Sequence, residues 1–306
     1  MKFKIFILAA FCSLSTFAQQ EPQYTQYMYN QGVVNPAYMI NEPGLIRVGS
    51  LYRSQWVGLD GAPKTANVFA NIPLNERVEI GVNYVNDQIG DVLTTNNFNV
   101  NFAYRINVAE NTNLSFGLKL GVDNQSLDFT DQNVGGDLAF QNGETTSLDV
   151  GVGAFLFKDN YYIGLSSPSV IPYKIENNFG NGDSSILYKK DPTAYLMAGY
   201  VYDVSDVLKI KPSAVAKWIS GAPLTYDLSL NALYDEKFEL GVSYRHQDAI
   251  AALAGFNITN DLKIGYSYDF NVSDLNRFNN GSHEVVLLYT FDLLGLQKRY
   301  ISPRFY

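Results

Sequence analysis

The sequence is poor in cysteine: Cys12 is the only one in 306 residues, and it lies in a short apolar stretch near the amino terminus. A lipid-modified cysteine would follow a small residue, whereas Phe11 precedes Cys12, so we do not expect lipidation. Once that stretch is removed, the chain has no cysteine. Disulfides and thiolate metal sites are then excluded.

Histidine is almost as scarce, with only His246 and His283, which are far apart and near the ends of expected strands. Neither has a serine, a carboxylate or a second histidine at a spacing that would predict a catalytic triad or a metal site. We expect both to be solvated. Gly151 and Gly153 lack the third glycine and the following helix of a dinucleotide fingerprint. We therefore predict no enzymatic activity, no cofactor and no metal.

Basic residues are outnumbered, 22 against 30 acidic ones, which argues against nucleic acid as a partner. After the amino terminus no run of 18 apolar residues follows, so no membrane-spanning helix is expected. One acidic stretch, with Asp128, Asp131 and Asp137, does not have EF-hand spacing. It is either a solvated loop or a calcium-binding loop.

Residues 1–18 have the pattern of a secretory signal peptide. Lys2 and Lys4 precede a short apolar core, and a small-residue site at Ala18 predicts cleavage before Gln19. A membrane-anchoring helix is the alternative, but the apolar stretch is short for one. Removal of the two lysines leaves 20 basic and 30 acidic residues, a net charge of −10 (20 − 30).

Strict alternation dominates the rest of the chain, and residues 97–122 show it best. Two arms flank a polar turn, and apolar residues occupy every second position: Phe98, Val100, Phe102, Tyr104, Ile106, Leu114, Phe116, Leu118, Leu120 and Val122. A period of two predicts β-strands with one apolar face. Each arm has about ten residues, the length that a tilted strand needs to cross a bilayer.

The same pattern predicts fourteen strands. They cover about 45–56, 65–73, 78–86, 94–107, 113–123, 147–158, 161–167, 192–203, 207–218, 225–234, 238–246, 250–258, 262–269 and 283–291. Early connections alternate between long and short, as expected for a bacterial barrel with long loops at one end and short turns at the other. Near the end of the chain there is again a long connection, 270–282. The expected fold is all-β, an antiparallel transmembrane β-barrel of about 14 strands in the outer membrane; a soluble β protein is the alternative.

The expected organisation has four parts. Residues 1–18 are the signal peptide, 19–44 a non-strand segment, 45–292 the barrel, and 293–306 a tail with Lys298, Arg299 and Arg304. Both chain ends are expected on the periplasmic, short-turn side. The basic tail would meet an acidic partner or be solvated.

Three stretches go beyond a generic barrel. They are Gln23-Tyr24-Thr25-Gln26-Tyr27-Met28-Tyr29-Asn30 with Val34-Asn35-Pro36-Ala37-Tyr38, Tyr52-Arg53-Ser54-Gln55-Trp56 with Gly61-Ala62-Pro63-Lys64-Thr65, and Val85-Asn86-Asp87-Gln88-Ile89-Gly90. In this order after a signal peptide, they resemble the PorP/SprF family of outer-membrane proteins of the type IX secretion system in Bacteroidetes. The resemblance covers essentially the whole chain after residue 18.

The resemblance implies a barrel without enzymatic activity that works with the secretion machinery. It also implies that secreted cargo, such as a gliding adhesin, is received or anchored by its carboxy-terminal domain. Outer-membrane lipid would surround the barrel. An outer-membrane diffusion channel or small-ligand transporter is the alternative function.

Candidate binding residues follow from the same stretches: Tyr24, Gln26, Tyr27, Tyr29, Asn30, Asn35, Pro36, Tyr38, Arg53, Gln55 and Trp56. Residues 23–38 have no strand alternation, and Asn35-Pro36 should stop regular structure. Their tyrosines and amides either touch a partner or pack as a plug against the barrel's own wall. Arg53 and Gln55 are expected to face the lumen, and Trp56 to join an interfacial aromatic belt.

Overall fold

The computed structural model describes residues 22–40, 42, 44–130, 142–178 and 184–292. The expected signal peptide and the basic tail lie outside these residues, as do Asp131 and Asp137. Seventeen strands are described: β1 (Leu45–Ser54), β2 (Lys64–Pro73), β3 (Val78–Ile89), β4 (Leu93–Ala109), β5 (Thr112–Leu127), β6 (Gly143–Phe157), β7 (Tyr161–Ser169), β8 (Tyr173–Asn178), β9 (Ser184–Lys190), β10 (Thr193–Tyr200), β11 (Tyr202–Ser205), β12 (Leu208–Ile219), β13 (Thr225–Tyr234), β14 (Phe238–Arg245), β15 (Ala249–Asn257), β16 (Leu262–Asn271) and β17 (Ser282–Asp292).

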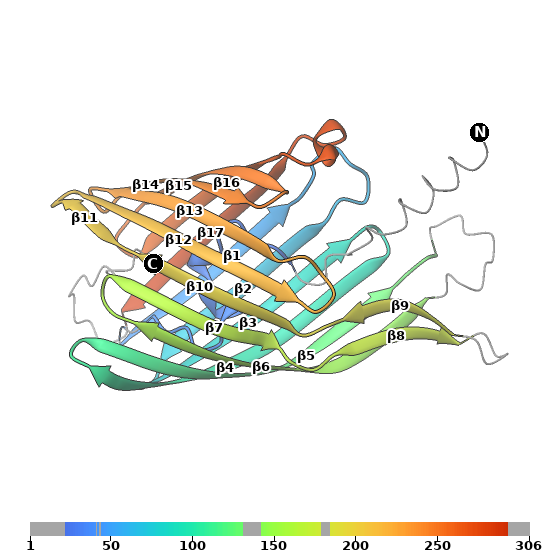
Figure 1. Ribbon diagram of the computed structural model, residues 1–306, viewed down its shortest axis with the longest axis horizontal. Coiled ribbons are helices and arrows are strands. Elements are labelled where there is room, and N and C mark those ends of the chain that lie inside the picture. Colours follow the sequence, from blue (N-terminus) through green and yellow to red (C-terminus); the bar gives the residue numbers. More distant parts are fainter. Residues whose placement is uncertain (1–21, 41, 43, 131–141, 179–183, 293–306) are drawn as a thin grey trace.

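The strands close into one antiparallel barrel (Figure 1). Consecutive strands pair around the wall, β1 pairs with β17, and β10 pairs with β12. β8 and β9 pair only with each other and are not part of the wall, and β10 and β11 both lie against β12 and together form one barrel strand, so the barrel has fourteen strands. The predicted fold class is confirmed.

The break between β10 and β11 is one difference from the sequence prediction, which expected a single strand over 192–203. Gly199 pairs with Ser213 and Tyr202 with Ile210, so the register continues across the break. Pro212 lies opposite it and has no N–H to complete the ladder. At the break, the Val201 N–H bonds the Asn160 carbonyl instead, at 2.7 Å.

The other differences lie at the long-loop end of the barrel. Residues 168–191 were expected to be a loop, but they contain the hairpin β8–β9, which pairs only with itself and projects beyond the barrel (Figure 1). β5 and β6 remain paired as far as Leu127 and Gly143, where the prediction ended the strands at 123 and 147.

Side chains alternate across the wall as predicted. On β4 and β5, Phe98, Phe102 and Leu118 are exposed on the outer surface, whereas Asn99 and Lys119 are buried inside. A polar inner row and an apolar outer row are what a membrane-spanning barrel requires. Among the described residues, no helix is long and apolar enough to cross a bilayer.

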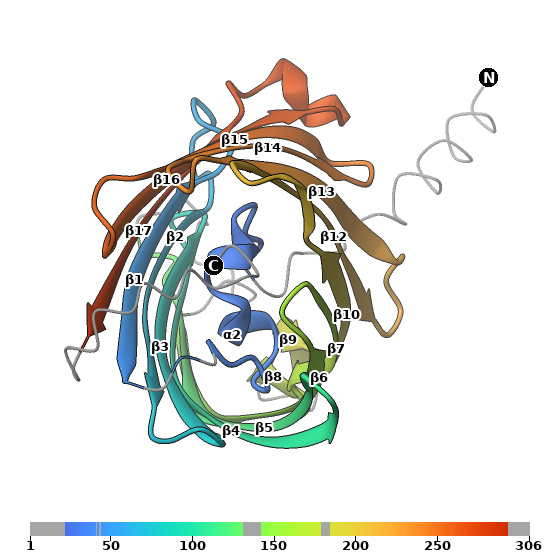
Figure 2. The same ribbon diagram turned by 90° about the vertical axis from the view of Figure 1, so that its left-hand side faces the viewer.

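Three short helices complete the structure: η2 (Tyr27–Tyr29), α2 (Gln31–Val34) and η3 (Asp274–Arg277). Viewed along the barrel, α2 lies inside the ring of strands (Figure 2). Nearly every residue from 24 to 40 is buried. We call residues 22–40 the plug.

The plug runs from one end of the barrel to the other. Thr25 bonds Asp269 and Glu284, which lie beside the long loop 272–281. At the other end, the Ile40 N–H bonds Glu79, next to the short turn 74–77. The first described residues therefore lie at the long-loop end, opposite the end where β17 finishes. The expectation that both chain ends lie on one side concerns residues outside the described ranges, so it stays a prediction.

Candidate functional site

The polar contacts of the plug begin with an ionic cluster at the long-loop end. Arg53 on β1 forms salt bridges with Asp269 on β16, at 2.8 Å, and with Glu284 on β17, at 3.1 Å. All three side chains are at most 2% exposed. Arg245 on β14 lies 3.7 Å from the same Asp269 carboxylate. The alternation of each strand turns these groups inward.

Plug atoms complete this cluster. The backbone N–H groups of Thr25 and Gln26 donate to the two oxygens of Glu284, at 2.9 and 2.7 Å. The Thr25 hydroxyl donates to Asp269 and accepts from Arg53. Charged hydrogen bonds of this kind are the strong ones in proteins. Arg245 also donates to the Tyr24 carbonyl, at 3.3 Å, so four barrel strands fasten the start of the plug.

The middle of the plug contacts two parts of the wall, β13 and β14 on the one hand and β2 and β3 on the other. The Tyr27 hydroxyl lies 3.3 Å from the Ser229 hydroxyl, and the Tyr29 hydroxyl donates to Glu239 at 2.9 Å. The Asn30 amide donates to Asn67 and Asn83 of β2 and β3. Lys263 lies above the Tyr29 ring, 4.7 Å from its centroid, and adds a cation–π contact.

The last third of the plug packs on β5, β6 and β7. The Asn35 amide donates to the Ala154 carbonyl at 3.1 Å, and the Ser115 hydroxyl donates to the Ala37 carbonyl. Asn35 also accepts the Ala37 N–H, at 2.9 Å, which forms the turn that ends α2 before Pro36. Tyr38 meets Phe155 edge to face, with ring centroids 5.8 Å apart.

Inward-facing glycines make room for these contacts. A Cβ on Gly117 would overlap backbone atoms of Pro36 and Ala37, and a Cβ on Gly153 would overlap the Asn35 side chain. Only glycine permits this close approach of one backbone to another.

The structure brings most of the predicted site residues together. Tyr24, Gln26, Tyr27, Tyr29, Asn30, Asn35, Pro36 and Tyr38 lie in the plug, and Arg53 and Gln55 face it from the wall, all buried. Trp56 stands apart: it follows the end of β1, is half-buried, and has a φ of 44°. The Trp56 backbone N–H donates to the Ser282 hydroxyl at 3.1 Å.

Sequence reasoning missed the wall residues that hold the plug, namely Thr25's partners Asp269 and Glu284, and also Glu79, Arg245 and Ser115. The alternation places each of them in the inward row. No signal in one sequence pairs them with their plug partners, which for Glu284 lie as far away in the chain as Thr25.

The two histidines lie at the barrel's edge, near strand ends, as predicted. His283 bonds the Tyr266 hydroxyl at 2.6 Å on the outer surface, and His246 stacks on Tyr226 with centroids 4.6 Å apart. Within the described ranges, no three acidic, histidine or cysteine side chains gather as a metal site would require.

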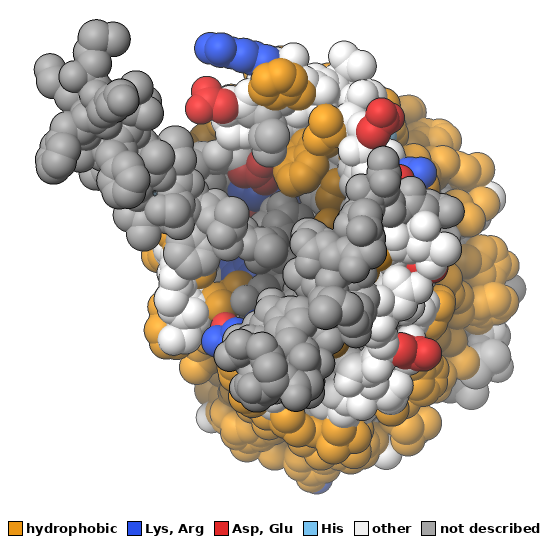
Figure 3. Space-filling model, turned by 90° about the vertical axis from the view of Figure 1, so that its right-hand side faces the viewer, with side chains coloured by type: hydrophobic (Ala, Val, Ile, Leu, Met, Phe, Trp, Pro, Cys, Tyr) orange, Lys and Arg blue, Asp and Glu red, His pale blue; other side chains and the backbone are white. Residues whose placement is uncertain are grey.

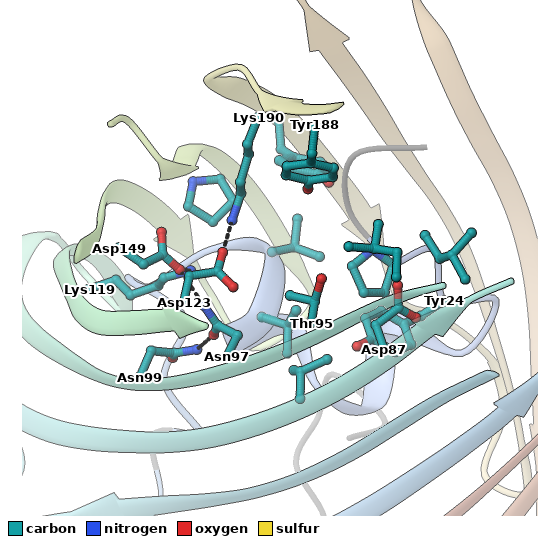
Figure 4. A pocket seen from close by; sticks show the side chains of 18 residues that line it. Tyr24, Asp87, Thr95, Asn97, Asn99, Lys119, Asp123, Asp149, Tyr188 and Lys190 are labelled. Carbon is teal, nitrogen blue, oxygen red and sulfur yellow. Dashed lines mark hydrogen bonds and ion pairs between the residues drawn. The ribbon is translucent and has the colours of Figure 1, made fainter. Parts of the chain in front are cut away.

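A cavity of about 80 Å³ lies between the plug and the wall, towards the long-loop end (Figure 4). Lys119, Asp123, Asp149 and Lys190 lie on one side of it, and Asp87 and Tyr24 on the other. Seen from outside, this end of the barrel carries polar and charged side chains around its opening, with apolar side chains on the outer wall (Figure 3). The full lining is Pro22, Tyr24, Val33, Val34, Val85, Asp87, Ile89, Leu93, Thr95, Asn97, Asn99, Lys119, Asp123, Asp149, Pro168, Tyr188, Lys190 and Tyr195.

The hairpin β8–β9 covers part of this cavity. Lys190 donates to Asp123 at 2.8 Å, and the Tyr173 hydroxyl donates to the same oxygen at 3.0 Å. Burial raises the pKa of the Tyr173 phenol, and neighbouring Tyr188 and Asp123 raise that pKa further. The phenol therefore stays protonated and keeps its role as donor.

A closed fourteen-stranded barrel with an apolar outer surface and an occupied, polar lumen defines a plugged outer-membrane β-barrel. The sequence matches the type IX secretion system membrane protein PorP/SprF family over residues 16–289, and the chain belongs to that family. No curated protein matches the sequence.

Solved structures share the fold at low identity. A Pseudomonas aeruginosa FadL homologue is 14% identical, with 90% of this chain and 95% of that chain covered and a TM-score of 0.53. The TodX deltaS2S3 mutant, a monoaromatic hydrocarbon channel, is 9% identical, with 86% and 94% covered and a TM-score of 0.51. The Acinetobacter baumannii outer membrane protein Omp33 is 10% identical, with 82% and 99% covered and a TM-score of 0.49.

Proposed function

We propose that this type IX barrel is a non-enzymatic binding component rather than a conduit. It binds subunits of the secretion machinery, or it anchors or helps export secreted cargo, such as a gliding adhesin, through the cargo's carboxy-terminal domain. One observation carries the proposal: the plug fills the lumen and bonds the inner wall along its length, from Glu284 to Glu79. A diffusion channel needs an open lumen.

The proposed orientation places the short turns in the periplasm, as in other bacterial barrels. The end of β17 at Asp292 then leads into the periplasm, where machinery subunits would be reached. Pro22 and Tyr24 lie at the long-loop end, which faces outside, beside the cavity and the hairpin β8–β9. Cargo would meet the barrel at that outer end.

The eleven candidate residues have a different role in this proposal from direct partner contact. Ten of them are buried between plug and wall, so a partner reaches their side chains only if the plug leaves. We propose that they keep the plug seated. Partner binding then falls to the exposed ends of the barrel.

A small-ligand transporter is the second candidate function. It is favoured by the fold shared with the FadL homologue and the monoaromatic hydrocarbon channel, and by the cavity next to the plug. In that case the plug would have to move for each transported molecule.

Electrical recording separates the two candidates. The purified full chain is inserted into planar bilayers and its conductance is measured. We expect no steady ohmic current, because the plug closes the lumen; steady current in the full chain would contradict the binding role in this form. Co-purification from native membranes, followed by identification of the recovered proteins, tests the binding itself. Recovery of no secretion subunit and no secreted protein would contradict it.

A further inference from the structure

The cavity beside the plug carries an unbalanced negative charge. Three carboxylates and two ammonium groups line it: Asp87, Asp123, Asp149, Lys119 and Lys190. Lys119 pairs with Asp149 at 2.7 Å, and Lys190 pairs with Asp123 at 2.8 Å. The carboxylate of Asp87 is left over, which gives the lining a net charge of −1 (2 − 3).

Asp87 on β3 is buried, and within the described ranges its carboxylate accepts one hydrogen bond, from the Thr65 hydroxyl on the neighbouring strand. No basic side chain of the described residues forms an ion pair with it. An ionised carboxylate out of water is costly without a counter-charge. A cation that entered the cavity would supply that counter-charge.

The two paired carboxylates offer further acceptors. The Oδ1 atoms of Asp123 and Asp149 are buried and have no hydrogen-bond partner among the described residues, although both side chains line the cavity. Buried acceptors are normally satisfied. These acceptors lie across the cavity from Asp87 and add to the negative character that favours a cationic ligand with N–H donors, such as an ammonium or guanidinium group.

The remaining lining suits a short apolar stem. Val33 and Val34 from the plug and Val85, Ile89 and Leu93 from the wall line the same cavity. Aromatic rings add to this surface: Tyr24, Tyr188 and Tyr195. Aromatic faces attract cations, and aliphatic walls take up methylene groups. A space of about 80 Å³ holds only a few such groups.

We propose that this cavity binds one protonated amine or guanidinium group on a short apolar stem, with the cationic head at Asp87. The ligand is a free alkylamine or the lysine or arginine side chain of a peptide. The site goes beyond the proposed secretion role, and binding here does not require the plug to leave, since plug residues form part of the lining.

Calorimetric titration of the full chain in detergent at pH 7 tests the site, with n-butylamine as probe and n-butanol as its uncharged match. We expect saturable, one-site binding of the amine and none of the alcohol. Replacement Asp87→Asn should weaken amine binding at least about tenfold, because a charge-assisted hydrogen bond is lost. Asp91→Asn, an exposed change in the adjoining turn, should leave binding unchanged.

A second variant covers the case in which Asp87→Asn disturbs folding. Val85→Phe keeps the charge and fills the cavity, so it should also weaken binding. A capped Gly-Lys-Gly peptide, compared with n-butylamine, shows whether a side chain on a backbone gains access. Equal binding of the alcohol, unchanged affinity in a folded Asp87→Asn protein, or no saturable binding of either amine probe would overturn the proposal.

Discussion

Arg53 joins two buried carboxylates of the inner wall to the plug. Its guanidinium contacts Asp269 and Glu284 on two other strands and the Thr25 hydroxyl of the plug. Because the cluster is almost fully out of water, each charge depends on the others for compensation. The same side chain therefore stabilises the wall and fastens the plug.

Replacement Arg53→Ala should destabilise the barrel by about 3 kcal/mol, because two carboxylates lose their main counter-charge. The loss of unfolding free energy stays near the lower end of the range for broken buried ion pairs, because Thr25 and Gln26 still donate to Glu284. Urea unfolding in lipid vesicles measures this free energy. As a control, Lys237→Ala removes an exposed ion pair with Asp235 and should change stability by less than about 1 kcal/mol. Equal effects of both changes would contradict this account.

Gly117 is the second informative residue, because its missing side chain leaves space for the plug backbone. Gly117→Ala should push Pro36 and Ala37 away from the wall, so the plug should be cleaved faster by added protease while the barrel stays folded. Gly81→Ala is the matched control: its Cβ would lie 3.4 Å or more from the nearest atoms, an ordinary contact. Equal cleavage of both variants would mean that the plug is not held there.

Among the elements, the hairpin β4–β5 shows that the alternation of apolar and polar side chains indicates which face of a strand pair lies outside the barrel. Its paired positions keep the same side: Phe102 lies opposite Leu118 outside, and Asn101 lies opposite Lys119 inside. A register shift by one residue would turn every apolar side chain inward.

Leu118→Arg places a charge on this outer face near mid-strand. It should cost about 2–4 kcal/mol if the face meets lipid, because a charge at the bilayer midplane is expensive. Val108→Arg, next to the short turn, should cost only about 0–1 kcal/mol. Unfolding titrations in lipid vesicles compare the two. A neutral Leu118→Arg would mean that this face does not contact the hydrocarbon layer.

The hairpin β8–β9 is an element that alternation alone did not reveal. Its strands of six and seven residues lie in a stretch that was expected to be a long loop. Short strands that pair only with each other have a weak sequence pattern. Contacts with the barrel, such as Lys190 with Asp123, hold the hairpin over the cavity.

In the whole molecule, the closed barrel encloses a polar interior and the plug completes that interior. The inner wall carries buried charged and amide groups that would face bulk water in an empty barrel, and the plug satisfies many of them. Arg53, Glu239 and Glu79 each bond a plug atom. The lumen is therefore a polar core shared between the barrel and its amino-terminal segment.

Deletion of residues 19–37 should leave a folded, heat-modifiable barrel, because the strand ladder does not depend on the plug. The deletion variant should conduct steady ohmic current in planar bilayers, where the full chain does not. It should still recover partners in a pull-down, because we propose that partners bind the exposed ends of the barrel. Lost recovery would mean that partners bind the plug or need the plugged state, and unchanged conductance would mean that the lumen stays closed without these residues.

The sequence by itself determined the number of barrel strands, the face of each strand and the inward position of Arg53 and Gln55, because strand period and pleat are local properties. Only the tertiary structure decided between a plug and a free segment, the direction of the plug, and the cavity at Asp87. Those features depend on contacts between side chains far apart in the chain, such as Thr25 and Glu284. Periodicity carries no information about which inward groups meet across a closed barrel.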